Sequence, residues 1–137
     1  MRKRILFAFI LIGATSLICC KKDKGPDVRD SFVATYSVTE TWTENNKTMT
    51  KPSFTMSIEK SSQFINMVLI NNFGNYGAGV TAEALIDGKT ITITQQTLPN
   101  LKSISGTGTL TDATLSFVYT ESYLNASFDI NTEANKK

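Results

Sequence analysis

The sequence contains no histidine and only two cysteines, which are adjacent at Cys19 and Cys20. Both cysteines lie near the N-terminus, so the rest of the chain has no disulfide framework and no thiol nucleophile. A Ser-His-Asp triad and a His/Cys zinc site are excluded for the same reason. We therefore expect a protein that is not an enzyme of these kinds, with no catalytic residue, no metal and no cofactor.

Charge of either sign is also scarce. Lysine and arginine number 14 and the acidic residues 12, which gives a formal net charge of +2. Three of the basic residues are Arg2, Lys3 and Arg4, so the remainder of the chain is close to electrically balanced. Nucleic-acid-binding proteins gather positive charge on one face, and this chain is not expected to bind nucleic acid.

Residues 1–19 have the pattern of a signal peptide. A basic start is followed by an apolar stretch, residues 5–18, which as a helix would cover about 21 Å and would not cross a hydrocarbon core of ~30 Å. Leu17-Ile18-Cys19-Cys20 resembles the lipobox of bacterial lipoproteins. That resemblance implies that Cys20 becomes the acylated N-terminus and anchors the protein to a membrane. A secreted protein with ordinary leader cysteines is the alternative.

The segment that follows, residues 20–31, has the composition of a flexible linker. It is charged and carries Gly25-Pro26. We expect an outer membrane lipoprotein of the cell envelope, and the sequence leaves open whether it faces the cell surface or the periplasm.

From Phe32 onward, apolar and polar residues alternate with a period of two, and no window shows a helical stripe. Eight such runs with short connections predict an all-β fold, an eight-stranded antiparallel up-and-down barrel over residues 32–132. A two-sheet β-sandwich is the alternative. Threonine and serine on the outer face argue against a transmembrane barrel, whose lipid-facing side is apolar.

Two hairpins are predicted from turn residues. Asp87-Gly88 is expected to pair Ile86 with Lys89. Asp112-Ala113 is expected to pair Leu110 with Leu115, which sets Gly106 and Gly108 opposite Tyr119 and Phe117, so that an aromatic ring covers each glycine. Residues 64–70 form an apolar run without alternation, which predicts either a covered strand or a partner patch. Residues 124–130 alternate, and Leu124 is expected to point inward.

Several segments resemble the small lipocalin-like lipoprotein domains of Bacteroidota. The resemblance implies a lipocalin-like barrel in the cell envelope, and because its motifs are structural it implies no activity and no site residues. The segments are Phe32 to Glu40, Asn72-Phe73-Gly74, Val80-Thr81-Ala82, Ile91-Thr92-Ile93 and Ser105 to Leu110.

The longer connections of such a meander, residues 43–50, 71–78 and 95–100, meet at one end of the barrel. Trp42, Glu40 and Glu121 are expected to reach this mouth with inward side chains, beside Phe73 and Tyr76. Aromatic rings with carboxylates suit a glycan or an amphiphile. The alternative is that the aromatic residues plug the barrel end and the glutamates extend into water.

We therefore expect a membrane-anchored binding module for a small apolar or amphipathic ligand or a glycan. A structural or partner-binding subunit of an envelope complex is the alternative, suggested by residues 64–70. A hydrolase using Glu40 and Glu121 is disfavoured, because adjacent strands lie ~4.8 Å apart and the pair would be about 10 Å apart, at the limit for two catalytic carboxylates.

Overall fold

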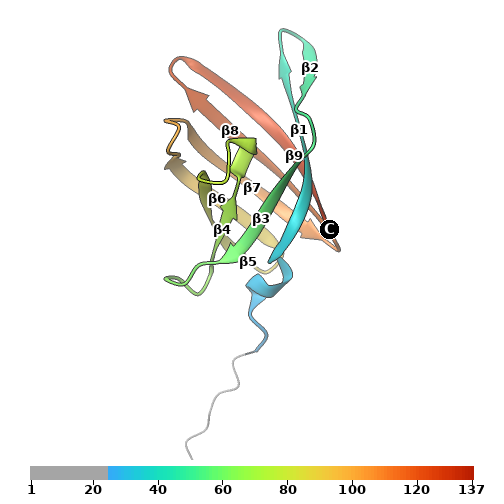
Figure 1. Ribbon diagram of the computed structural model, residues 1–137, viewed down its shortest axis with the longest axis vertical. Helices are drawn as coiled ribbons and strands as arrows, with labels where there is room; N and C mark the ends of the chain where they lie inside the picture. The colour runs from blue at the N-terminus through green and yellow to red at the C-terminus, as the bar shows by residue number, and fades with distance from the viewer. Residues whose placement is uncertain (1–24) are drawn as a thin grey trace, which may run out of the picture.

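The computed structural model describes residues 25–137, whose strands follow one another around a closed ring (Figure 1). Every neighbouring pair is antiparallel, and the ring closes where the first strand pairs with the last. The expected eight-stranded up-and-down barrel is thus confirmed, with one strand added, and the alternative, a two-sheet sandwich, is not what the chain forms. The ring consists of β1 (Ala34–Glu44), β3 (Phe54–Lys60), β4 (Met67–Asn71), β5 (Thr81–Asp87), β6 (Thr90–Thr97), β7 (Ser103–Thr111), β8 (Thr114–Tyr123) and β9 (Ala126–Lys136).

The inward residues of these strands fill the barrel. Tyr36 and Tyr119 are fully buried, and the rings of Phe73 and Tyr119 lie 4.7 Å apart in an edge-on arrangement. Gly106 pairs with Tyr119 and Gly108 with Phe117, as predicted, so backbone without a side chain makes room for each ring. The fold therefore has a packed interior, and space for a ligand is found at its ends or on its wall.

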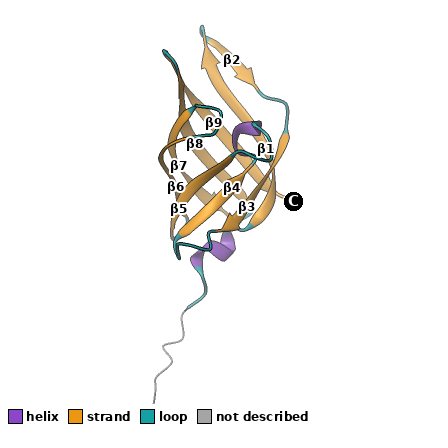
Figure 2. Cartoon of the chain, turned by 60° about the vertical axis from the view of Figure 1, so that its left-hand side comes forward, coloured by secondary structure: helices purple, strands orange, loops and turns teal. Residues whose placement is uncertain are grey.

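The added strand, β2 (Lys47–Thr50), lies in residues 43–50, which the sequence predicted to be a loop. Instead, β1 continues to Glu44, turns at Asn45 and Asn46 and returns as β2. Both asparagines have positive φ, 50° and 60°, the conformation that a two-residue hairpin turn needs and that asparagine tolerates. The hairpin projects beyond the rest of the barrel (Figure 2).

β2 and β3 are in effect one partner strand of β1, interrupted at residues 51–53. Thr41 pairs with Thr50 but Val38 pairs with Phe54, so the register slips by a residue. Pro52 has no N–H to donate and breaks the ladder here. Because strand side chains alternate between faces, this slip turns Lys51 inward, on the same side as Phe54.

The predicted hairpin at residues 87–88 needs a correction. The turn is Gly88–Lys89, with Asp87 paired to Thr90 and Ile86 paired to Ile91. Gly88 has φ of 57° and Lys89 does not have positive φ, which is the geometry of a turn with glycine at its first central position. The shift is an even number of residues, so the inward face is the one predicted.

Two further predictions about strand residues are wrong. Residues 64–66 belong to the β3–β4 loop, and β4 begins only at Met67. Leu124 is 86% exposed, because it occupies the β8–β9 turn with φ of 53°. β9 begins at Ala126 and continues past residue 132 to Lys136, so its seven-residue pairing with β1 closes the ring.

The end of the barrel opposite β2 is closed by η1 (Val28–Ser31), a short 3₁₀ helix inside the segment expected to be linker (Figure 2). The carboxylate of Asp27 caps it by accepting from the backbone N–H of Arg29 at 3.0 Å. The following residue, Phe32, is fully buried. The predicted signal peptide and Cys20 lie outside the described residues. None of the helices within residues 25–137 has the length and apolar character needed to cross a membrane.

Candidate functional site

The loops expected at the mouth do meet at one end. The β1–β2 hairpin, η2 (Phe73–Asn75), the β6–β7 loop and the β8–β9 turn lie at the end opposite η1 (Figure 1). Glu40 of β1 and Glu121 of β8 both point inward there and are 1% and 7% exposed. The glutamates are thus buried rather than extended into water.

Glu40 is held by a lysine and a tyrosine. Lys51 Nζ lies 2.6 Å from Oε2 of Glu40, and the Tyr119 hydroxyl donates to Oε1 at 3.1 Å. Lys51 also donates to the carbonyl oxygen of Gly74 at 3.0 Å, which ties η2 to the strand break at Pro52. Burial, together with the neighbouring negative charge of Glu40, raises the pKa of Tyr119 far above its usual value, so its hydroxyl remains a donor.

Glu121 has a matching pair of partners. Lys102 Nζ lies 2.6 Å from Oε1, and the hydroxyl of Tyr76 donates to Oε2. Lys102 also donates to the Tyr76 hydroxyl oxygen at 3.0 Å. Burial and the hydrogen bond to Glu121 raise the pKa of Tyr76 well above its usual range, so this hydroxyl too keeps its proton.

Tyr76 joins the two ion pairs. Lys51 Nζ lies 4.8 Å and Lys102 Nζ 4.3 Å from the centre of its ring, a favourable position for a cation over an aromatic face. The ring occupies this place because Gly74, with φ of 60°, has no side chain; a Cβ there would lie 3.0 Å from Cδ2 of Tyr76. Two cations and two carboxylates thus surround one phenol ring.

A cleft of about 240 Å³ opens above this network. Trp42 and Phe128 supply apolar surface, and the ion-paired groups supply donors and acceptors. Its lining residues are Trp42, Glu44, Lys51, Tyr76, Lys102, Glu121, Phe128 and Ile130. The cleft therefore suits a small polar ligand with one apolar face.

The structure separates the five predicted site residues into two groups. Trp42, Tyr76 and Glu121 line the cleft, whereas Glu40 lies in the network below it and Phe73 is fully buried against Tyr119. For Phe73 the alternative interpretation, a residue that plugs the barrel, is right. Sequence reasoning missed Lys51, because only the slip at Pro52 turns it inward, and Lys102 and Phe128, whose positions depend on the loop and turn beside them.

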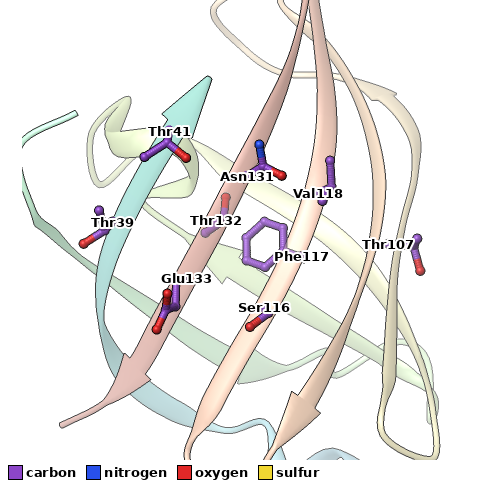
Figure 3. Close-up of a pocket in the computed structure, with 9 residues that line it drawn as sticks. All are labelled: Thr39, Thr41, Thr107, Ser116, Phe117, Val118, Asn131, Thr132 and Glu133. Atoms are coloured by element: carbon purple, nitrogen blue, oxygen red, sulfur yellow. The ribbon is translucent and has the colours of Figure 1, made fainter. Parts of the chain in front are cut away.

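A second concavity, about 340 Å³, lies over β7, β8, β9 and β1 (Figure 3). The paired row Thr107, Val118, Asn131 and Thr41 crosses all of these strands with short side chains. The neighbouring row contains Ser116, Glu133 and Thr39. Most of the residues that line it have polar side chains, and Glu133 is the single charged residue among them.

No family model and no curated protein matches the chain. The chain resembles the crystal structure of a candidate outer membrane protein from Bacteroides fragilis, with 17% sequence identity and a TM-score of 0.49. The matched region covers 81% of this chain and 53% of that one, so the present chain spans about half the length of the protein it resembles.

Proposed function

We propose that this chain is a lipoprotein of the cell envelope, anchored through an acylated Cys20. Its barrel mouth binds a small ligand that combines an apolar face with hydroxyl groups, such as a sugar unit of a glycan or a short amphiphile. The observation that carries this proposal is the cleft that Trp42 and Phe128 line together with the Lys102–Glu121 pair. Indole and phenyl surfaces pack against the apolar face of a sugar, while ammonium and carboxylate groups bind its hydroxyls.

The size of the cleft limits the ligand. Its volume of about 240 Å³ is below the range of roughly 300 to 1,000 Å³ that is usual for drug-sized ligands. Phe73, Tyr119 and Tyr36 fill the interior beneath it. A long apolar ligand of the kind held deep inside a hollow barrel does not fit, and we propose that a single ring or a chain end binds at the rim.

No catalytic step belongs to this proposal. Each candidate carboxylate already contacts an ammonium group and a tyrosine hydroxyl, Glu40 through Lys51 and Tyr119, and Glu121 through Lys102 and Tyr76. Both carboxylates are thus engaged in ion pairs, and binding is the function that this arrangement supports.

The sequence itself provides the probe for a test, because Trp42 is the single tryptophan of the chain. Monosaccharides, short glycans and short-chain amphiphiles are titrated into the purified lipoprotein in detergent while the Trp42 emission is recorded. A ligand in the cleft shifts this emission. Replacement Phe128→Ala, which removes one apolar wall, is expected to weaken binding about tenfold or more, the equivalent of 1.4 kcal/mol.

Phe64→Ala is the matched control, since Phe64 is an exposed phenylalanine at the opposite end of the barrel. It is expected to leave the affinity unchanged. Binding that shifts no Trp42 emission and tolerates Phe128→Ala would remove the mouth as the site.

A partner-binding role is the second candidate, and β2 favours it. All of its residues are exposed, and within residues 25–137 it pairs with β1 alone, so one backbone edge is open. An open edge can accept a strand from another protein. The test is hydrogen exchange on an envelope complex that contains the lipoprotein at fixed stoichiometry: protection of residues 47–50 supports this role, and unchanged exchange there excludes it.

A further inference from the structure

The β3–β4 loop, residues 61–66, lies at the end of the barrel that η1 closes (Figure 1). It exposes large apolar side chains. Phe64 is 54% and Ile65 is 85% exposed. The loop contains no charged residue. The turns of β5–β6 and β7–β8 at the same end each contain a charged residue, Lys89 and Asp112 respectively. Large apolar side chains gathered at one exposed place mark a contact surface.

Several backbone groups of this loop are already hydrogen-bonded inside the protein. Arg29 Nη1 donates to the carbonyl oxygens of Ser61 at 3.1 Å and Phe64 at 2.8 Å. The Ser61 hydroxyl accepts from the N–H groups of Gln63 and Phe64, and the carbonyl of Asn66 accepts from the N–H of Ile86 at 2.8 Å. Backbone groups that are paired in this way lose little when the loop leaves water, whereas unpaired ones carry a large penalty.

The charge of Arg29 is balanced within the same cluster. Its guanidinium contacts Asp27 with Nη2 at 2.7 Å and Nε at 2.9 Å. Lys60 pairs with Asp27 at 3.1 Å and also with Asp30. The Arg29 hydrogen bonds hold the pKa of the Asp27 carboxyl well below its usual range, so the pairing persists over ordinary pH. The loop is thus fastened to η1 by a cluster of two cations and two anions.

The position of this loop relative to the expected anchor identifies its partner. Gly25, where the described chain begins, is five residues from Cys20, a stretch that spans at most about 18 Å when fully extended. Arg29 lies in η1, only four residues after Gly25, and its side chain is hydrogen-bonded to the loop at Phe64. Val28 of η1 is half exposed at the same end. Acyl chains on Cys20 would therefore hold the lipid surface within reach of Phe64 and Ile65.

We propose that Phe64 and Ile65 insert into the lipid surface and form a second membrane contact beside the acyl anchor. This inference rests on the proposed function, since it needs Cys20 to be acylated. Apolar side chains at such a contact enter about 5–10 Å into the boundary between headgroups and acyl chains. Two contacts fix the direction of the barrel, where a tether alone would let it rotate, and they turn the mouth away from the membrane.

The test uses the absence of other thiols. Outside Cys19 and the acylated Cys20 the chain has no cysteine, so a cysteine placed at one position gives a single labelling site. Ile65→Cys is labelled with a nitroxide in the full lipoprotein, which is reconstituted in phosphatidylethanolamine and phosphatidylglycerol vesicles. Leu124→Cys is the matched control, because Leu124 is 86% exposed, like Ile65 at 85%, but lies at the mouth.

In the electron paramagnetic resonance experiment, the label at residue 65 is expected to gain collisions with oxygen, which concentrates in lipid, and to lose collisions with a water-soluble nickel chelate. The label at residue 124 is expected to remain accessible to the chelate. Vesicle-bound, acylated protein with both labels equally accessible to the chelate overturns the second contact and leaves the anchor intact. Shielding of residue 65 only in native membranes indicates a protein partner and also overturns it. A mature protein without an acyl group on Cys20 overturns both proposals.

Discussion

The ion pair between Lys51 and Glu40 offers the sharpest test of how the mouth is stabilised. Replacement Lys51→Met keeps the length and apolar stem of the side chain and removes the ammonium group. Among the described residues, the Glu40 carboxylate, 1% exposed, then retains only the Tyr119 hydroxyl as a hydrogen-bond partner. Breaking a buried pair by removing one partner costs about 3–5 kcal/mol, because a buried charge is left uncompensated.

The lower part of that range is expected here. The Lys51 side chain is 20% exposed, so water reaches the pair from one side and reduces the cost. The variant also loses the hydrogen bond from Lys51 to the Gly74 carbonyl, worth about 1 kcal/mol. We expect a total loss of about 4 kcal/mol in the free energy of unfolding, a large share of the 5–15 kcal/mol that is usual for a domain.

Urea unfolding followed by far-UV circular dichroism measures this loss, provided that the slopes of the transitions agree. Adding Glu40→Gln to Lys51→Met removes the uncompensated charge, so the double variant is expected to regain at least about 1 kcal/mol. Lys47→Met is the matched control: Lys47 is exposed on β2 and forms no ion pair within the described residues, so a change within about 0.5 kcal/mol is expected. The reasoning is refuted if the Lys51→Met variant is as stable as the parent protein, or if the double variant is less stable than Lys51→Met alone.

Three further predictions follow from the interior. Thr132 is buried and its hydroxyl has no hydrogen-bond partner within residues 25–137. Thr132→Val is therefore expected to raise the free energy of unfolding by about 1 kcal/mol, and a lower urea midpoint would contradict this. A Cβ on Gly106 would lie 2.6 Å from Cβ of Tyr119, so Gly106→Ala is expected to cost roughly 1–3 kcal/mol in thermal unfolding, whereas Gly79→Ala, which meets nothing within 4 Å, serves as the neutral control. Burial raises the pKa of Tyr36 to about 12. Because the folded state binds this proton more tightly than the unfolded state, the stability that it contributes is retained below about pH 10 and is lost as the pH rises toward 12, by about 1.4 kcal/mol per pH unit for this group. The raised pKa values of Tyr76 and Tyr119 add to the loss, so unfolding at each pH, with the absorbance of tyrosinate, is expected to show a decline at least this steep.

The period-two alternation was enough to predict the barrel, because a closed meander is the simplest way to bury one face of many short strands. The register of the β7–β8 hairpin was also predictable, since Gly106 and Gly108 face large rings across the strand. The Gly88–Lys89 turn was misplaced because Asp-Gly fits two different turn positions. Only the pairing with β6 distinguishes them.

The mouth was harder to predict, since it depends on irregular backbone. The alternation assigns Glu40 and Glu121 to the inward face, but nothing in it indicates which cations join them. Lys51 turns inward through a one-residue slip, and Lys102 follows a loop in which Leu101 has positive φ. The exposure of Leu124 has a similar origin, because its own turn takes it out of the alternation.

The slip at residues 51–53 has a consequence for how this chain can change in length. Because strand faces alternate with odd and even positions, Lys51 and Phe54, which are three positions apart, share the inward face only because the slip takes up one residue. Without one residue of this segment, β2 and β3 would form one continuous strand in which the lysine still faces Glu40. A change at the Asn45-Asn46 tip would alter only the projecting hairpin. Relatives of this protein should therefore tolerate changes of length at the tip and also the loss of one residue at the Pro52 segment, and in both cases the lysine and the glutamate should be kept together.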